Sequence, residues 1–311
     1  MYRSILVPLD GSTFAEHALP IACALAQRAD AMLRLVHVHT LSSSLRYSGD
    51  EPVVEENLVA QSRKQARLYL AQVRERLAAF AGPELKITIE NLEFAITQTV
   101  NEPLGGFLAA YAATTDADLI IMTTHGRSGL VRFWLGSVAD TLVRLSHLPI
   151  LLLQPTAAEP DFSQPPQFKN MLIPLDGSAL AEQILEPALA LGELLGTDYT
   201  LLRAVEPLFP VYNLLLKTQE LDESGLQEAW GYLHQVGQQL AVAERRLHTR
   251  VFLATQPADA ILQSTQRHAN DLIALATHGK SGLTRLMVGS VADKLLRGAT
   301  IPMLVYRPQQ G

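Results

Sequence analysis

The chain has 311 residues, of which 48% are hydrophobic and 18% are charged, so it can bury large cores and lacks the composition of a disordered protein. Its length favours two domains. The formal net charge of −6 argues against nucleic-acid binding, which needs a concentrated basic face. A single cysteine, Cys23, excludes an internal disulfide framework and a cysteine-based metal cluster.

No segment of the sequence is typical of a membrane anchor or an export signal. The apolar run at residues 5–7 is too short for the hydrophobic part of a signal peptide. No apolar stretch approaches the ~20 residues that a membrane-spanning helix needs. We therefore expect a soluble, cytoplasmic protein with no membrane partner.

Short apolar runs alternate with longer stretches of helical spacing along the first half of the chain. The runs predict strands over residues 5–9, 32–38, 87–94, 119–123 and 150–153. The stretches between them predict helices over residues 15–29, 58–80, 103–114 and 136–145. This alternation is typical of βαβ units around a parallel sheet.

A proline-rich segment separates the two halves. Residues 154–168 contain four prolines and little apolar periodicity, which predicts a linker. We place the domains at residues 1–155 and 169–311, with a linker at residues 156–168. The second half then predicts strands over residues 171–175, 200–205, 250–254, 272–276 and 302–306.

The second half repeats the first. Residues 5–12 and 171–178 share L-x-P-L-D-G-S, and residues 124–140 and 277–293 share T-H-G-x-S-G-L-x-R-x-x-x-G-S-V-A-D. The two repeats are offset differently, and a longer loop at residues 41–55 of the first copy accounts for the difference. The sequence therefore predicts two tandem doubly wound five-stranded parallel-sheet domains of the Rossmann-like α/β class.

Doubly wound sheets bind ligands beyond the carboxyl ends of their strands, where the strand order reverses. Both shared motifs fall there, because the turn from Asp10 to Ser12 follows the first strand and the loop of His125 and Gly126 follows the fourth. We expect them to face each other across one crevice.

The glycines and serines of the second motif are candidates for phosphate binding. Gly126 is followed after nine residues by Gly136 and Ser137, and glycine lets backbone N–H groups approach an anion. Ser137 has capping-box spacing to Asp140, so it is expected to cap a helix whose N-terminus can receive a phosphate. The alternative is that these residues only turn the chain and cap the helix.

Two other nucleotide motifs are rejected. A Walker A loop ending at Gly279 and Lys280 would need a glycine where Ala274 stands. Neither copy carries G-x-G-x-x-G after its first strand, which disfavours a dinucleotide-binding domain.

With these motifs, V-P-L-D-G-S in the opening strand and T-H-G-R-S-G-L closing on G-S-V-A, the chain resembles the universal stress protein family over both halves. The resemblance implies an adenine-nucleotide alpha-hydrolase-like fold that binds ATP, AMP or ADP, with Mg²⁺ as a possible companion. Members that bind ATP carry G-x-x-G, nine residues and then G-S or G-T, and here Thr123 and Ala276 replace the first glycine.

The resemblance also implies which residues bind the nucleotide. In the first copy they are Pro8, Leu9, Asp10, Val38, Thr123, Gly126, Arg127, Gly136, Ser137 and Val138. In the second copy they are Pro174, Leu175, Asp176, Val205, Ala276, Gly279, Lys280, Gly289, Ser290 and Val291. The aspartates, prolines and strand-end valines belong to the adenine and ribose side. The serines with their flanking glycine amides hold the phosphates, and Arg127 and Lys280 offset phosphate charge.

Several of these residues have an equally good structural explanation. Asp10 and Asp176 can accept backbone hydrogen bonds. His125 and His278 are better explained as loop-ordering residues than as catalytic ones. His37 and His39 lie on one face of a strand, but no third ligand accompanies them, so a metal pair is disfavoured.

The preferred hypothesis is a nucleotide-binding regulatory protein of the stress response. The alternatives are a scaffold of the same fold without a nucleotide, and a slow ATPase or phosphotransferase, for which the sequence provides no recognisable base. Family resemblance further implies pairing through the last strands, at residues 148–153 and 301–306. This predicts an intramolecular pseudo-dimer, with a homodimer of chains as a further step.

Overall fold

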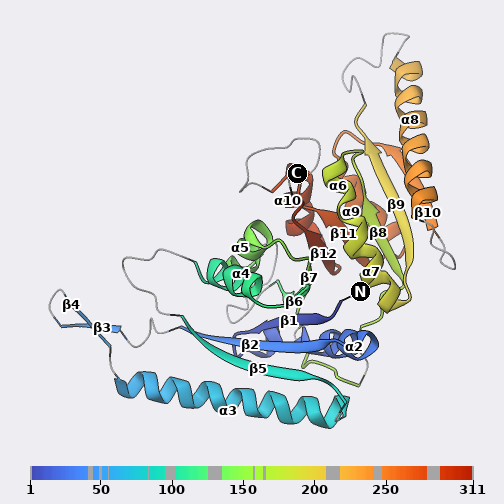
Figure 1. Cartoon of the computed structure of the whole chain (residues 1–311). Helices are drawn as coiled ribbons and strands as arrows, with labels where there is room; N and C mark the ends of the chain where they lie inside the picture. The colour runs from blue at the N-terminus through green and yellow to red at the C-terminus, as the bar shows by residue number, and fades with distance from the viewer. Residues whose placement is uncertain are drawn as a thin grey trace. The chain divides into compact units, whose positions relative to one another are not determined.

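The computed structural model describes residues 2–40, 45–48, 51–54, 56–82, 84–94, 103–124, 135–156, 158–163, 166–207, 218–240, 247–278 and 288–309. The chain divides into two compact units, Met1–Pro166 and Gln167–Gly311, called unit 1 and unit 2 below (Figure 1). Within the described residues, no helix combines the length and hydropathy that crossing a bilayer would require.

Unit 1 is built on a parallel sheet with the order β7-β6-β1-β2-β5. Its strands are β1 (Ser4–Leu9), β2 (Met32–Thr40), β5 (Ile87–Phe94), β6 (Leu119–Thr123) and β7 (Ile150–Leu153). Every residue of β6 and β7 is buried, as expected for a parallel sheet covered on both faces.

Unit 2 repeats this sheet with the order β10-β9-β8-β11-β12. Its strands are β8 (Asn170–Pro174), β9 (Asp198–Val205), β10 (Leu247–Leu253), β11 (Leu272–Ala276) and β12 (Met303–Tyr306). In each unit the strand order reverses between the first and fourth strands. The predicted fold class, two doubly wound five-stranded parallel sheets, is confirmed.

Equivalent helices connect the strands in the two units. Unit 1 has α1 (Thr13–Glu16), α2 (Leu19–Ala29), α3 (Glu56–Ala81), α4 (Leu104–Thr114) and α5 (Ser137–Leu145). Unit 2 has α6 (Ala179–Glu182), α7 (Leu185–Leu195), α8 (Thr218–Gln239), α9 (Pro257–Arg267) and α10 (Ser290–Gly298). Helix α3 packs on β2 and β5, and α8 packs on β9 and β10.

Two sequence predictions about local structure were wrong. The helix predicted over residues 15–29 is broken into α1 and α2, because the Asp-Gly-Ser turn starts a separate short helix. The segment predicted as a loop contains an antiparallel pair, β3 (Leu45–Ser48) with β4 (Glu51–Val54).

An aspartate before the fourth strand of each sheet fixes the start of the first strand. The Asp118 carboxylate accepts hydrogen bonds from the backbone N–H groups of Arg3 at 2.6 Å and Ser4 at 3.1 Å. Asp271 accepts equivalent bonds from Lys169 and Asn170, both at 2.9 Å. These contacts hold the first and fourth strands side by side, which sets the position of the crevice at their other ends.

Candidate functional site

The Asp-Gly-Ser motif forms a closed turn at the end of the first strand. Asp10 Oδ1 accepts hydrogen bonds from the N–H of Ser12 at 2.9 Å and from its Oγ at 2.6 Å. Ser12 Oγ in turn accepts from the N–H of Ala15 at 3.2 Å and caps α1. Gly11 has a φ of 83°, which is a left-handed conformation that favours glycine. One oxygen of the aspartate therefore orders the turn.

Unit 2 builds the same turn with almost the same distances. Asp176 Oδ1 accepts from Ser178 N–H at 2.9 Å and Oγ at 2.6 Å, and Gly177 has a φ of 83°. The structural role considered for both aspartates is thus present in both copies.

The second motif starts a helix, but the predicted capping box is wrong. The N-cap residues are Gly136 and Gly289, and neither helix has a side-chain cap hydrogen bond. Ser137 is the first helical residue of α5, one position later than predicted, and Asp140 pairs with Arg144 at 2.8 Å instead of reaching back. The first turn of each helix consequently keeps N–H groups that an anion can reach.

The glycine amides themselves have another function than predicted. The N–H of Gly136 donates to the carbonyl of Thr124, and that of Gly289 donates to Thr277, both at 2.8 Å. A Cβ placed on Gly289 would lie 3.2 Å from the Thr277 oxygen. The glycines therefore join the helix start to the end of the fourth strand, and phosphate contacts are left to the amides of the following residues.

Unit 1 contains a cavity of about 220 Å³ at the carboxyl ends of its strands. It brings together the predicted site residues that the structure describes in this copy: Pro8, Leu9, Asp10, Val38, Thr123, Gly136, Ser137 and Val138. Gly126 and Arg127 lie outside the described residues, as does His125.

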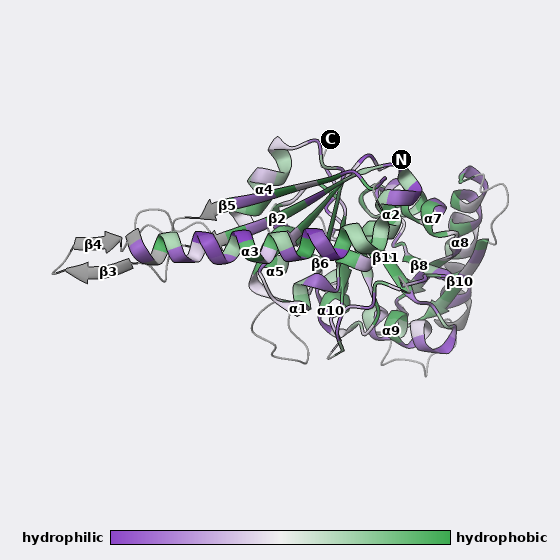
Figure 2. Cartoon of the chain, turned by 90° about the horizontal axis from the view of Figure 1, so that it is seen from below, coloured by the Kyte–Doolittle hydropathy of each residue, from purple (hydrophilic) through white to green (hydrophobic). Residues whose placement is uncertain are grey.

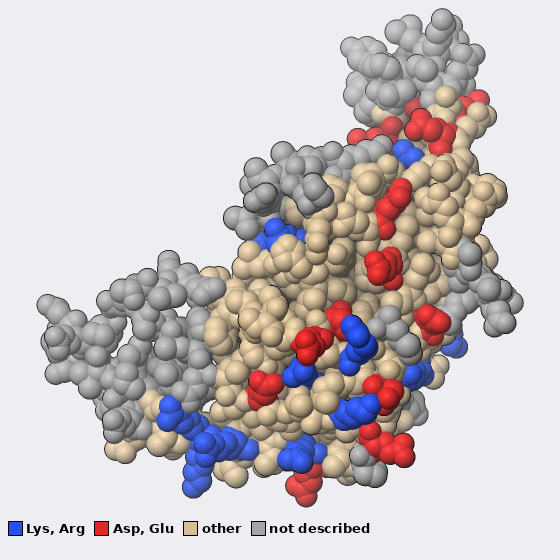
Figure 3. Space-filling view, in the orientation of Figure 1, with Lys and Arg blue, Asp and Glu red and all other residues tan. Residues whose placement is uncertain are grey.

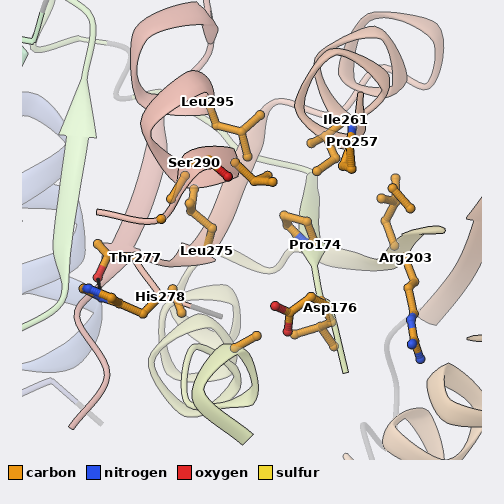
Figure 4. Close-up of a pocket in the computed structure, with 18 of the residues that line it drawn as sticks. Pro174, Asp176, Arg203, Pro257, Ile261, Leu275, Thr277, His278, Ser290 and Leu295 are labelled. Atoms are coloured by element: carbon orange, nitrogen blue, oxygen red, sulfur yellow. Dashed lines mark hydrogen bonds between the residues drawn. The ribbon is translucent and has the colours of Figure 1, made fainter. Parts of the chain in front are cut away.

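Unit 2 contains a larger cavity, of about 520 Å³, in the same place. Ser290 and Asp176 lie on different sides of it (Figure 4). It likewise collects the described site residues of this copy: Pro174, Leu175, Asp176, Val205, Ala276, Gly289, Ser290 and Val291. Gly279 and Lys280 lie outside the described residues.

Side-chain size differs at equivalent positions around the two cavities. The register pairs Pro8 with Val36 and Pro174 with Leu202, so the position of Val38 is taken by Ala204 and not by Val205. Thr123 of unit 1 likewise corresponds to Ala276.

The start of the fourth connecting helix differs as well. Leu104 of α4 lines the unit 1 cavity, and its counterpart Pro257 begins α9 beside the unit 2 cavity. Together with the two strand-end positions, unit 1 has the bulkier side chain at three places around the ligand space.

A buried network that the sequence did not predict lies next to each Asp-Gly-Ser turn. In unit 1 Glu16 is 3% exposed, and its carboxylate pairs with Arg76 at 2.8 Å. Burial and the neighbouring Glu16 carboxylate raise the pKa of Tyr69 above its ordinary value. The ring of His37 lies 5.6 Å from that of Tyr69, and its Nδ1 lies 3.1 Å from Asn91 Oδ1.

The unit 2 network replaces the histidine with an arginine. Tyr232 donates to Glu182 Oε1 at 2.9 Å, and burial together with this carboxylate raises the pKa of Tyr232. The Arg203 guanidinium, whose side chain is only 12% exposed, lies 5.0 Å from the Tyr232 ring centre and 4.0 Å from Glu228. Figure 4 shows it pointing away from Ser290. Glu16 and Glu182 each lie six residues after the motif aspartate, which is the only sequence signal for this network.

The histidines show contacts within the fold. His278 lines the unit 2 cavity, and its Nδ1 lies 2.9 Å from Thr277 Oγ1. The side chain of His39 is outside the described residues. In the part of the chain that the structure describes, no group of three or more His, Cys, Asp or Glu side chains could hold a metal ion.

The duplicated sheet and the cavity at each point of strand reversal define a tandem α/β protein of the doubly wound class. The model of the universal stress protein family matches residues 1–154 and 167–307. The chain therefore belongs to the universal stress protein family, as its motifs had indicated.

Individual relatives agree with this assignment. A universal stress protein of Mycobacterium tuberculosis is 29% identical over 205 residues, and the match covers 62% of this chain and 63% of that relative, which is less than two thirds of its length. A universal stress protein of Mycolicibacterium smegmatis is 25% identical over 311 residues, or 98% of this chain and 97% of the relative. The crystal structure of a universal stress protein from Archaeoglobus fulgidus covers 98% of both chains, with a TM-score of 0.65 and 17% identity, a likeness in fold.

Proposed function

We propose that this protein is a regulatory member of the universal stress protein family that binds an adenine nucleotide, ATP or its AMP and ADP relatives, in the cavity of unit 2. The observation that carries the proposal is this cavity of about 520 Å³, which joins the ends of β8, β9 and β11 to the start of α10. Its volume lies within the ~300–1,000 Å³ typical of small-molecule sites.

The two sides of the cavity suit the two parts of a nucleotide. The start of α10 has no side-chain cap, and the first N–H groups of such a helix attract phosphate through hydrogen bonding and the helix dipole. Pro174, Leu175 and Val205 give the opposite side an apolar surface for a base, and Asp176 can accept from ribose hydroxyls. Mg²⁺ would accompany the phosphates of ATP and reduce their charge.

Unit 1 supports a second candidate function, a domain of the same fold that acts as a scaffold without nucleotide. Its cavity of about 220 Å³ is smaller than the usual range for such ligands, although the phosphate side is built from the same residues. We therefore expect nucleotide to bind more weakly in unit 1 than in unit 2.

We propose binding rather than catalysis as the main activity. Phosphoryl transfer requires positioned cations and a base or an oriented water, and His278, the described histidine of the cavity, is engaged with Thr277. Slow ATP hydrolysis that survives Ser290→Ala would be incidental to binding. Pairing between the last strands, β7 and β12 or their copies in a second chain, remains a separate prediction about assembly.

Ser290→Asp provides the test. An acidic residue in the first turn stabilises a helix but places a negative charge where phosphate is expected, and like charges in contact cost several kcal/mol. We expect calorimetric affinity for Mg-ATP to fall at least about tenfold, with thermal stability unchanged or raised. Ser137→Asp is the matched control, because it makes the same change at the start of α5.

The proposal would be overturned if purified protein carried no nucleotide by mass spectrometry and gave no heat or thermal shift with Mg-ATP. Equal loss of affinity in both variants would assign the main site to both units. Loss in Ser137→Asp alone would move it to unit 1.

A further inference from the structure

The two equivalent helices α3 and α8 carry opposite charge. Helix α3 has more basic than acidic residues. Its acidic residues are Glu56 and Glu75, and its basic residues are Arg63, Lys64, Arg67, Arg74 and Arg76. The sequence of α8 has no Lys or Arg, and its acidic residues are Glu220, Asp222, Glu223 and Glu228. The same helix of the repeated fold is therefore basic in unit 1 and acidic in unit 2.

Each helix buries an apolar face in its own unit and exposes the opposite face. Val73 and Leu77 of α3 are completely buried, as are Ala229 and Leu233 of α8. Figure 2 shows the resulting alternation of apolar and polar turns along α3. On the visible surface, Lys and Arg gather over α3 and Asp and Glu gather near the start of α8 (Figure 3).

A large apolar side chain interrupts each charged face. Leu68 is 56% exposed on α3, and Trp230 is 45% exposed on α8. Lys64 lies one turn before Leu68, and Glu223 lies two turns before Trp230, so each charge shares a face with the apolar residue. Tryptophan is enriched among the central residues that contribute most to binding at protein interfaces, and charged residues are typical of the surrounding rim.

We propose that α3 of one chain binds α8 of a second copy of this chain, with Leu68 against Trp230. The helices run parallel in this pairing, because Lys64 and Glu223 then lie on the same side of the contact between Leu68 and Trp230. Two basic residues follow Leu68, but Arg76 pairs with Glu16 of its own unit and Arg74, six residues after Leu68, lies on another side of the helix. In an antiparallel pairing Lys64 and Arg67 would face the end of α8, where His234 and the glutamines offer no acidic partner.

Charge complementarity favours a second copy over other partners. A nucleic acid would be attracted to α3 and repelled by α8, whereas copies of this chain offer each of the two helices a partner of opposite charge. Opposite charges also steer association and suppress incorrect registers. This surface is distinct from the predicted pairing of last strands and does not depend on nucleotide.

Charge reversal tests the pairing. By sedimentation at low salt, we expect association of the wild-type chain to increase with concentration. Lys64→Glu or Glu223→Lys should weaken association at least about tenfold, since like charges in contact cost several kcal/mol. Combining both substitutions in one chain should restore association. Arg74→Glu is the control, because Arg74 lies level with the uncharged end of α8 in the proposed pairing. This substitution should change the association constant by less than about twofold.

Four results would overturn the proposal. The first is a monomer at every concentration, and the second is a dimer that neither charge reversal weakens. The third is an effect of the single substitutions on stability without any dependence on concentration, which would indicate an interaction within one chain. Loss of association in the double variant as well would also contradict it, because the swapped charges remain complementary.

Discussion

Units 1 and 2 have the same backbone fold but differ in the side chains that line their cavities. The Asp-Gly-Ser turns have the same hydrogen bonds, and α5 and α10 both start at a serine after an N-cap glycine. The cavities nevertheless measure about 220 and 520 Å³. The parts that shape the backbone are therefore the same in both copies, while the side chains that line the cavities differ.

A second difference lies in the cores. Unit 1 contains the single cysteine of the chain on α2, completely buried, whereas the corresponding helix of unit 2 has Leu189 at this position. Each unit has two tyrosines whose pKa is raised by burial and a nearby glutamate, Tyr69 and Tyr111 in unit 1 and Tyr232 and Tyr306 in unit 2. Titration of the tyrosines should change the stability of both units alike. Titration of the Cys23 thiol should change the stability of unit 1 alone.

The largest expected effect is a greater loss of stability in unit 1 at alkaline pH. Burial raises the pKa of the Cys23 thiol from 9.0 to about 12. Above pH 9 the unfolded chain loses this proton and the folded one keeps it, so the stabilisation is complete below pH 9 and is lost up to about pH 12. In this range the free energy of unfolding should fall by about 1.4 kcal/mol per pH unit. Urea unfolding at several pH values measures this dependence, and Cys23→Ala should abolish it.

Each unit has one tryptophan in its sequence, Trp134 in unit 1 and Trp230 in unit 2. Tryptophan fluorescence therefore reports the unfolding of one unit at a time when the tryptophan of the other unit is replaced by Phe. Unit 2 serves as the internal control, since Cys23→Ala should leave its pH dependence unchanged. Parallel curves for the two units before the substitution would contradict the assigned difference.

The periodicity of apolar residues was sufficient to predict the strands of both sheets, but not the local structure around the candidate sites. Strands such as β6 and β11 were predicted correctly because short apolar runs bounded by polar segments are typical of buried strands. The capping box was wrong because spacing alone does not distinguish an N-cap from the first helical residue, and Gly136 takes the cap.

The networks beside the turns were also missed. The contact of Arg203 with Tyr232 joins a strand to a helix that is far away in the sequence, and no local pattern encodes such a distance. Likewise, the strand register showed that Ala204, not Val205, is equivalent to Val38, which letter matching at strand ends had not revealed.

An intermediate effect is expected from exchanging cavity residues between the units. Ala204→Val with Ala276→Thr gives unit 2 the side chains of unit 1 and should weaken its affinity for Mg-ATP about 10- to 200-fold, the range for added methyl groups in a binding pocket. The measurement is calorimetric titration of the full chain.

The reciprocal change, Val38→Ala with Thr123→Ala, should raise the affinity of unit 1, and Ser290→Asp in the same chain keeps unit 2 from obscuring the signal. Unchanged affinity in both exchanges would show that the difference in volume arises elsewhere, for example at Leu104 and Pro257.

The smallest expected effect concerns what the units share. Asp140 pairs with Arg144 at 2.8 Å, and Asp293 pairs with Arg297 at 2.9 Å, in both cases one turn apart on a partly exposed surface. Asp140→Asn and Asp293→Asn should each lower the free energy of unfolding by about 0.4 kcal/mol, and 1 M NaCl should remove most of this effect. A cost above about 1 kcal/mol in only one unit would mean that the two helices no longer have the same role, because an exposed ion pair alone does not account for it.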